Sequence, residues 1–296
     1  MNPDPRPEAS LRPTAGWHVG HFFYRFDRRH LRELGTSELG DGCREFVAAL
    51  DPERPDAPAR LQSFLVSGPK ADFGLIVLDP DPLAVDGVHQ RLAASPLGPA
   101  LAPVWSLVSL TEVSEYLPTA EQYGRELAAG GLPADSPEHA KRLKQYERRL
   151  EIMRRQRLTP DLPTWPAVCF YPMNKRRTAE ANWFLLDFPE RARLMRQHGE
   201  TGMRFAGKVT QLVTAAIGLD DWEWGVTLWA RNPEFLKEIV YRMRFDEASA
   251  RYADFGPLFS GSLAGAREIL DHCRVPARES AGVGREGKGR TQGNSH

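Results

Sequence analysis

The sequence has few cysteines, no long apolar run and no excess of charge of either sign. Its three cysteines lie far apart, which excludes a disulfide framework and a paired-cysteine zinc motif and suits a reducing compartment such as the cytoplasm. No apolar run approaches the roughly 20 residues that a membrane-spanning helix needs. The N-terminus is rich in proline and has no apolar segment, so we expect no signal peptide.

The charges balance over the whole chain but not along it. Lysine and arginine total 39, and so do aspartate and glutamate, so net charge gives no reason to bind nucleic acid. Positive charge gathers between Ser136 and Arg157, where Ser136 and Pro137 have the pattern of a helix start. The basic face of this helix is typical of a solvated, salt-bridged surface, because no nucleic-acid recognition motif accompanies it.

The hydrophobic pattern predicts the same order of elements twice, β-α-β-β-α-β. Apolar and aromatic runs indicate the strands, and apolar residues three and four apart indicate the helices. The first copy comprises 17–26, 28–50, 61–66, 73–78, 82–95 and 104–112. The second copy comprises 167–172, 188–204, 208–216, 222–230, 232–244 and 255–261. We expect Gly40 and Gly42 to interrupt the first helix.

Two copies of the split β-α-β unit imply an α+β protein with a tandem ferredoxin-like fold. Each sheet needs its open face covered, and the two sheets can cover each other in a barrel-like pair, as in a dimeric α/β-barrel. The predicted segments are a flexible arm at 1–15, an N-terminal domain at 16–117, a helical connector at 118–165, a C-terminal domain at 166–276 and a disordered tail at 277–296.

Tyr171 to Arg177 places a phenol, an amine and two guanidinium groups directly after an apolar run. Pro172 cannot donate to a central sheet ladder, so it predicts the end or the edge of the strand. The loop that follows a strand often carries the chemistry of an α/β protein. The alternative is a core tyrosine with a basic loop that faces water.

His198 lies on a predicted helix that begins with Asp187 as its cap. Leu194 and Met195 stand four and three residues before it, so His198 shares an apolar face with them. Such a histidine is either a satisfied core or interface residue or a metal ligand. On the strand at 208–216, alternation puts Gln211 between two valines on one face, which is unusual unless that face is exposed or lines a site.

Five segments carry a resemblance to a known family, in order and in spacing. They are Tyr171–Arg177, Leu194–Gly202, Ala206–Gln211, Asp220–Leu228 and Met243–Tyr252. Together they resemble the coproheme decarboxylases (HemQ type) of the chlorite dismutase superfamily. The resemblance is dense from about 157 to 261 and thinner back to 17, and it does not cover 1–15, most of 118–155 or the tail after about 265.

The resemblance implies a role for each site residue. His198 would be the proximal ligand of a porphyrin iron, and Gln211 would lie on the distal side. Chlorite dismutases carry arginine at the position of Gln211. Glutamine has no charge to hold an oxyanion, so Gln211 favours the decarboxylase branch. The positions that match the propionate-binding residues of the family are Tyr116, Arg157, Lys175 and Ser249. Since no C-x-x-C-H segment is present, the porphyrin would not be attached covalently in the c-type manner.

The implied substrate is Fe-coproporphyrin III (coproheme), which would also act as the redox cofactor, and the implied product is haem b. Hydrogen peroxide would be the oxidant, Tyr171 would form a tyrosyl radical that takes a hydrogen atom from a propionate, and Lys175 would hold the carboxylate. The family resemblance also implies a homopentamer, and we expect a transient contact with coproporphyrin ferrochelatase. The alternatives are a chlorite dismutase or peroxidase on the same fold and a non-catalytic haem carrier or sensor.

Overall fold

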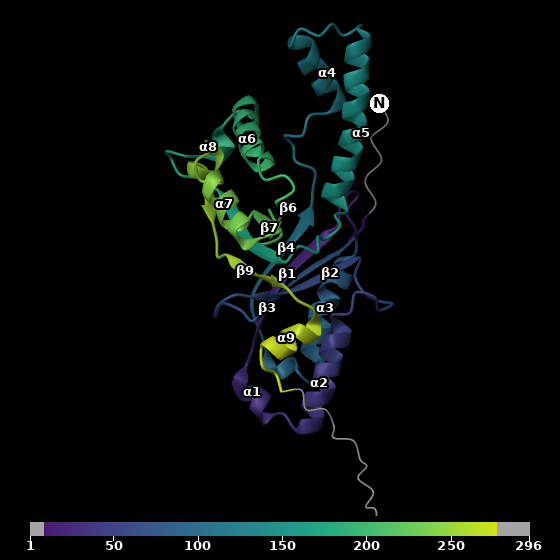
Figure 1. Ribbon diagram of the computed structural model, residues 1–296, viewed down its shortest axis with the longest axis vertical. Coiled ribbons are helices and arrows are strands. Elements are labelled where there is room, and N and C mark those ends of the chain that lie inside the picture. Colours follow the sequence, from purple (N-terminus) through teal and green to yellow (C-terminus); the bar gives the residue numbers. More distant parts are fainter. Residues whose placement is uncertain (1–8, 277–296) are drawn as a thin grey trace, which may run out of the picture.

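The computed structural model describes residues 9–276, in which nearly all predicted elements are present (Figure 1). The predicted tail at 277–296 and the first eight residues of the predicted arm lie outside this range. The first half contains β1 (His18–Phe26), α1 (Arg28–Glu33), α2 (Thr36–Ala49), β2 (Arg60–Val66), β3 (Phe73–Asp79), α3 (Pro82–Ala94), the short 3-10 helix η1 (Gly98–Ala100) and β4 (Leu101–Thr111). This is the predicted β-α-β-β-α-β order.

The first helical region differs from the prediction in the place of its break. The chain leaves the helix at Leu34 and Gly35, and α2 continues through Gly40 and Gly42 without interruption. Gly42 is needed for packing instead, because a Cβ there would lie 2.8 Å from Cγ of Leu97. The glycine therefore allows α2 to approach the segment after α3 closely.

The second half repeats the order with one extra strand. It contains β5 (Ala167–Lys175), η2 (Trp183–Leu185), α6 (Phe188–Met203), β6 (Val209–Ala215), β7 (Trp224–Ala230), α7 (Pro233–Met243), α8 (Glu247–Ala250), β8 (Ala253–Phe255), β9 (Phe259–Leu263) and α9 (Ala266–His272). The single strand predicted at 255–261 is thus two strands, β8 and β9.

Pro172 explains why these two strands are separate. The prediction that Pro172 marks the end of the strand is wrong, because β5 continues to Lys175. β9 pairs with β5 up to Phe170, and β8 pairs with β5 from Met173 onward. Pro172 lies at the gap between them, and its carbonyl accepts a hydrogen bond from the Gly256 amide at 2.9 Å. A residue without an N–H cannot continue the ladder on that side.

The strands hydrogen-bond in a closed ring that joins both halves. Their order is β7–β6–β4–β1–β3–β2–β9–β5, and β5 pairs in turn with β7. The inside of the ring is packed with aromatic side chains from both halves, such as Phe23 and Phe259, whose ring centroids lie 4.0 Å apart. The tandem ferredoxin-like fold is confirmed, and the pair of sheets closes into one barrel. Because both halves share this barrel, the division into units at 16–117 and 166–276 stays a prediction.

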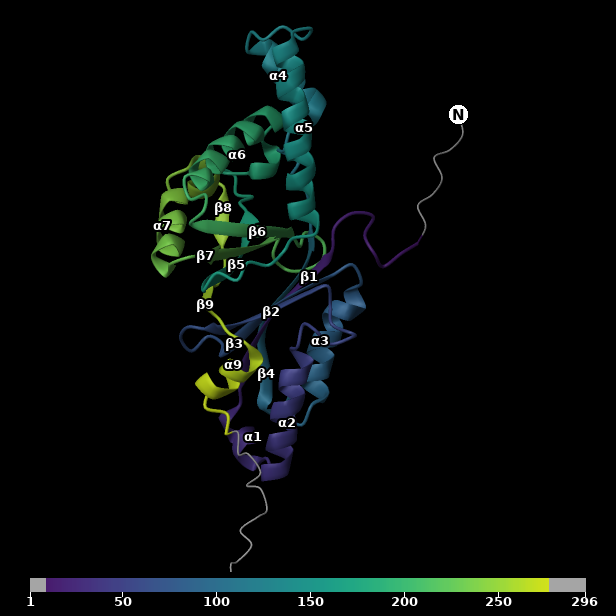
Figure 2. The same ribbon diagram turned by 45° about the vertical axis from the view of Figure 1, so that its right-hand side comes forward.

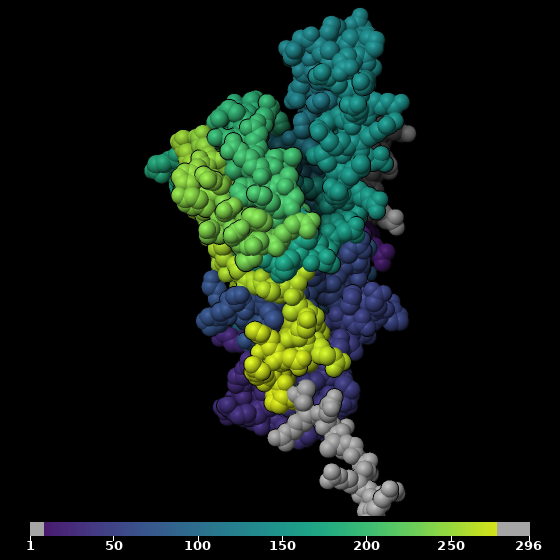
Figure 3. All heavy atoms as spheres, viewed as in Figure 1, coloured from purple at the N-terminus to yellow at the C-terminus, as the bar shows by residue number. Residues whose placement is uncertain are grey.

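The connector forms a helical hairpin that projects beyond the barrel (Figures 1 and 2). It consists of α4 (Ala120–Ala129), which was not predicted, and α5 (Pro137–Leu158). The predicted start of α5 is confirmed, because the Ser136 hydroxyl accepts from the His139 amide at 3.1 Å. In Figure 3 the hairpin stands beside the surface formed by α6 and α7. Among residues 9–276, no helix is both long and apolar enough to cross a membrane.

Candidate functional site

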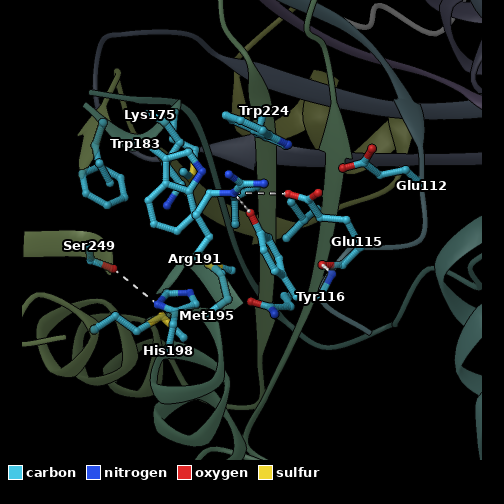
Figure 4. A pocket seen from close by; sticks show the side chains of 18 of the residues that line it. Glu112, Glu115, Tyr116, Lys175, Trp183, Arg191, Met195, His198, Trp224 and Ser249 are labelled. Carbon is cyan, nitrogen blue, oxygen red and sulfur yellow. Dashed lines mark hydrogen bonds and ion pairs between the residues drawn. The ribbon is translucent and has the colours of Figure 1, made fainter. Parts of the chain in front are cut away.

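A cavity of about 690 Å³ lies on the outer face of the C-terminal half of the barrel. Its floor comes from β5, β6 and β7, and its walls come from α6, α7, the segment after β4 and the end of α5. The residues predicted for the site all line it: Tyr116, Arg157, Tyr171, Lys175, His198, Gln211 and Ser249. Residues from 116 to 249 in the sequence therefore meet around one space (Figure 4).

His198 reaches the cavity from α6. Asp187 caps this helix as predicted, because its side chain accepts from the Glu190 amide. Leu194 is fully buried beneath the helix, whereas Met195 and His198 line the cavity. His198 Nδ1 lies 3.0 Å from Oδ2 of Asp246 and 3.4 Å from the Ser249 hydroxyl. When Nδ1 donates to the carboxylate, Nε2 carries no proton and is free to bind a metal.

Asp246 is a site residue that the sequence did not reveal. It is 3% exposed, and it also caps α8 by accepting from the Ser249 amide at 2.9 Å. Burial alone would raise the pKa of the Asp246 carboxyl, but the hydrogen bonds from His198 and Ser249 bring that pKa below its ordinary value. In the sequence, Asp246 stands three residues before Ser249. This spacing indicates a helix cap, but it does not indicate that the aspartate contacts a histidine.

Tyr171 lies on β5 with its side chain directed away from the barrel interior and into the cavity. The residue is 7% exposed and packs edge-on against Phe255, with ring centroids 5.7 Å apart. Burial raises the pKa of the phenol, and the nearby Arg244 guanidinium partly opposes this rise. No hydrogen bond to the hydroxyl is found within residues 9–276, so the phenol is buried, neutral and free to meet a ligand.

Lys175 lies on the same face of β5 as Tyr171. Every second residue of a strand points to the same side, and Tyr171, Met173 and Lys175 all line the cavity. Four residues of extended strand separate the Cα atoms of Tyr171 and Lys175 by roughly 13 Å. Lys175 Nζ lies 4.0 Å from the centroid of the Trp183 ring. Arg244, whose guanidinium carbon lies 3.9 Å from the centroid of Phe255, is the cation that acts on the phenol, and the sequence interpretation missed it.

We expect Lys175→Met to stabilise the protein at pH 7. Burial lowers the pKa of Lys175 to about 8 from an ordinary value of 10.5, and Asp246 and Glu223 only partly oppose this. Because the folded pKa lies below the unfolded one, the unfolded state binds more protons between these values, and the free energy of unfolding rises with pH across that window. The destabilisation by the buried ammonium is complete below pH 8, so replacing the ammonium with an apolar side chain should raise the free energy of unfolding by roughly 3 kcal/mol.

Urea denaturation at pH 7 and at pH 10 checks this expectation. The difference between Lys175→Met and the wild type should shrink at pH 10. Lys237, an exposed residue of α7, provides the control, because Lys237→Met should change the free energy of unfolding equally little at both pH values. A Lys175→Met protein that is less stable than wild type at pH 7 would show that the ammonium stabilises the fold.

Gln211 lies on β6 with the orientation that alternation predicts. Gln211 and Val213 line the cavity, whereas Leu212 and Thr214 point inward and are buried. The side chain of Gln211 is exposed to the cavity and comes from its floor, whereas His198 comes from the wall formed by α6. It supplies an amide without charge to this space.

Two further residues bring polar groups to the cavity from the connector side. Arg157 lies in the last turn of α5, and burial lowers the pKa of its guanidinium. It has no ion pair within residues 9–276, so its charge is available to an acidic ligand. The Tyr116 hydroxyl accepts from Nε of Arg191 at 3.2 Å, and burial raises the pKa of this tyrosine to about 12. Arg191 also lines the cavity and was missed in the sequence.

The cavity therefore combines apolar walls, one imidazole with a free nitrogen and several cations. These features match a flat apolar ligand with a central metal and carboxylates at its rim, because each buried carboxylate needs a donor and the metal needs an axial ligand. Within residues 9–276, no group of three or more histidine, cysteine, aspartate or glutamate side chains could hold a bare metal ion.

Comparisons with known proteins agree with this description. The sequence model of the family "Chlorite dismutase" matches residues 40–264. A coproheme decarboxylase from Staphylococcus carnosus is 37% identical over 251 residues, which are 84% of this chain and 92% of that protein.

Among solved structures, a haem-binding protein from Thermus thermophilus aligns with a TM-score of 0.69 and 32% identity over 90% of this chain and all of that one. A variant of chlorite dismutase from Candidatus Nitrospira defluvii aligns with a TM-score of 0.65 over 88% of this chain and 96% of that one. Its identity of 17% shows a common fold alone. By the extent of the family match and the identity to the staphylococcal relative, the chain belongs to the chlorite dismutase family.

Proposed function

We propose that this protein is a coproheme decarboxylase, which converts Fe-coproporphyrin III to haem b with hydrogen peroxide. Two of the four propionates react, and each of these loses its carboxyl group and one hydrogen from the β-carbon, while one peroxide takes up the two electrons and protons. The balance for each side chain is propionate plus hydrogen peroxide to vinyl, carbon dioxide and two water molecules. Two rounds give haem b. The observation that carries the proposal is one cavity in which His198, Tyr171 and several cations meet, in a chain 37% identical to a coproheme decarboxylase.

The residues would divide the work as follows. His198 would bind the iron through Nε2, held in orientation by Asp246. Tyr171 would lose a hydrogen atom from its hydroxyl and then take one from the propionate β-carbon. Its burial supports this role, because a phenol with a raised pKa keeps its proton until it is oxidised.

The remaining site residues would bind the substrate's carboxylates or face the open side of the iron. Tyr116, Arg157 and Lys175 would hold propionates, as predicted from the resemblance. We modify the prediction for Lys175 in one respect. The cation near the phenol of Tyr171 would be Arg244, and Lys175 would hold a propionate only. The Ser249 hydroxyl lies beside His198 Nδ1. Ser249 would therefore contact a propionate from the side of the porphyrin that faces His198. Gln211 would donate a hydrogen bond on the distal side without adding charge.

The direct test mixes purified protein with ferric coproporphyrin III and then adds peroxide. The porphyrin mass should fall by two carbon dioxide molecules and four hydrogen atoms. Oxygen release from chlorite would instead support a chlorite dismutase. Tight binding of the porphyrin with no mass change under peroxide would support a carrier or sensor.

The assembly and the location follow from the same proposal. We place the enzyme in the cytoplasm as a homopentamer that makes a transient contact with coproporphyrin ferrochelatase, because the resemblance implies the assembly and the substrate must be supplied by an enzyme that inserts iron. Light scattering of the purified protein measures the number of subunits, and a dimer or monomer would contradict this part of the proposal.

We expect Asp246→Asn to weaken coproheme binding by about 10- to 100-fold, the usual effect of removing the outer partner of a ligating histidine. Asparagine retains the cap of α8, because its side-chain oxygen can accept from the Ser249 amide. Its amide group can also donate to Nδ1, which would put the proton on Nε2 and block the iron. Titration followed by absorbance measures the dissociation constant. An unchanged constant for coproheme would show that Asp246 does not orient His198.

A further inference from the structure

Arg191 occupies a place at the cavity edge to which no role has been assigned. It stands on α6 seven residues before His198 and four before Met195, so the three side chains share the face of the helix that lines the cavity. Its Nη1 donates to the Leu186 carbonyl at 2.6 Å, and its Nε donates to the Tyr116 hydroxyl at 3.2 Å. Figure 4 shows the guanidinium between Trp183 and Glu115.

The acidic partner of Arg191 is loosely held. Glu115 Oε1 lies 3.8 Å from Nε of Arg191, near the outer limit of an ion pair. The side chain of Glu115 is 56% exposed, whereas that of Arg191 is 21% exposed. The largely buried guanidinium of Arg191 is thus paired with an exposed carboxylate. Because exposed ion pairs are weak, moving Glu115 into water should cost little free energy.

A second carboxylate lies close to this pair. Glu112 also lines the cavity, and burial and the charge of Glu115 raise the pKa of its carboxyl, although Trp224 partly opposes this. Two acidic groups at one edge repel any carboxylate that enters the cavity. A ligand carboxylate that reaches this edge therefore competes with Glu115 for the Arg191 guanidinium.

We propose that Arg191 binds one carboxylate of the porphyrin and that Glu115 holds the guanidinium in position until that carboxylate replaces it. The inference rests on the proposed function, because it takes a porphyrin with propionates as the ligand. The exchange is favourable since a porphyrin carboxylate enclosed in the cavity can form a close, charge-assisted contact, which the exposed glutamate does not. Tyr116 keeps the guanidinium directed toward the cavity in both states.

If this exchange occurs, substitutions of Arg191 and Glu115 should change the affinity for the porphyrin in opposite directions. Arg191→Gln should weaken the binding of metal-free coproporphyrin III by about 10- to 100-fold, the effect of losing a hydrogen-bonded charge. Glu115→Gln should tighten that binding by about 3- to 5-fold, because the competing carboxylate is gone. The metal-free ligand is chosen so that the bond between iron and His198 does not contribute. Quenching of tryptophan fluorescence measures the dissociation constants.

Matched variants control for net charge. Arg196 is exposed on the same helix and Glu121 is exposed on α4, and neither lines the cavity. Arg196→Gln and Glu121→Gln should each leave the dissociation constant within about 2-fold of wild type. Circular dichroism confirms that each variant is folded, and should Arg191→Gln fail to fold, Glu115→Gln tests the exchange alone.

The double variant separates exchange from simple repulsion. If Glu115 acts by competing for Arg191, the tightening caused by Glu115→Gln should disappear in the Arg191→Gln background. Tightening that persists in full would show repulsion of the ligand and would overturn the exchange. Weaker or unchanged binding by Glu115→Gln would equally overturn it, because the pair would then be a structural contact.

The outcome is independent of the decarboxylation itself. Binding of metal-free coproporphyrin III reports on Arg191 whether or not peroxide causes loss of carbon dioxide. If the variants behave as expected while coproheme keeps its mass under peroxide, the exchange holds and the proposed reaction is wrong. If the reaction proceeds and Arg191→Gln binds like wild type, the reaction holds and the exchange is wrong.

Discussion

Replacing Tyr171 with phenylalanine is expected to stop conversion of coproheme while leaving its binding intact. The variant keeps the ring that packs against Phe255 and removes only the hydroxyl, which has no hydrogen-bond partner within residues 9–276. The free energy of unfolding should change by less than about 1 kcal/mol, because a buried hydroxyl without a partner contributes little to stability. The rate of carbon dioxide loss should fall on the order of a thousandfold or more, as when an essential reacting group is removed.

Mass spectra of the porphyrin after timed additions of peroxide measure the rate, and absorbance titration measures the binding. Tyr241, which is 59% exposed on α7, provides the control, since Tyr241→Phe should react at the wild-type rate. Normal conversion by Tyr171→Phe would remove the radical role from this residue. Loss of binding together with activity would point to a structural role.

His198→Ala should have the largest effect on the affinity for coproheme. Removal of an outer partner of a ligating histidine costs about 10- to 100-fold, so loss of the ligand itself should cost more than about 100-fold. The site should otherwise remain, because the side chain of His198 is partly exposed to the cavity while Leu194 holds α6 in place.

Metal-free coproporphyrin III distinguishes ligation from folding. Its affinity should be nearly the same for His198→Ala and wild type, because no iron is present. Added imidazole should restore the wild-type absorbance spectrum when the variant is mixed with coproheme. Equal coproheme affinities for variant and wild type would show that His198 is not the axial ligand.

Much of the fold could be predicted from local patterns in the sequence. Apolar residues at intervals of two, or of three and four, indicated most strands and helices, and Ser136 and Asp187 indicated helix starts that are confirmed. α4 was missed because it has no buried residue and hence no strong apolar face. The break between β8 and β9 was missed because Pro172 lies on the neighbouring strand and interrupts them from there.

The site was predictable only in part, for a similar reason. The residues inferred from the resemblance all line one cavity. Asp246, Arg191 and Arg244 were not inferred, because a charged residue on a helix or in a loop looks the same in the sequence whether it faces water or a buried partner. Asp246 is separated from His198 by 48 residues, and Tyr116 from Arg191 by 75.

The sequence alone determined the periodicity of the elements, the two copies of the β-α-β-β-α-β order and the face on which His198 and Gln211 stand, since these depend on the spacing of neighbouring residues. The tertiary structure decided that both halves close into one barrel and that Asp246 meets His198. It also decided which cations line the cavity. These features depend on contacts between distant segments, and the spacing of residues within a segment does not specify its partner.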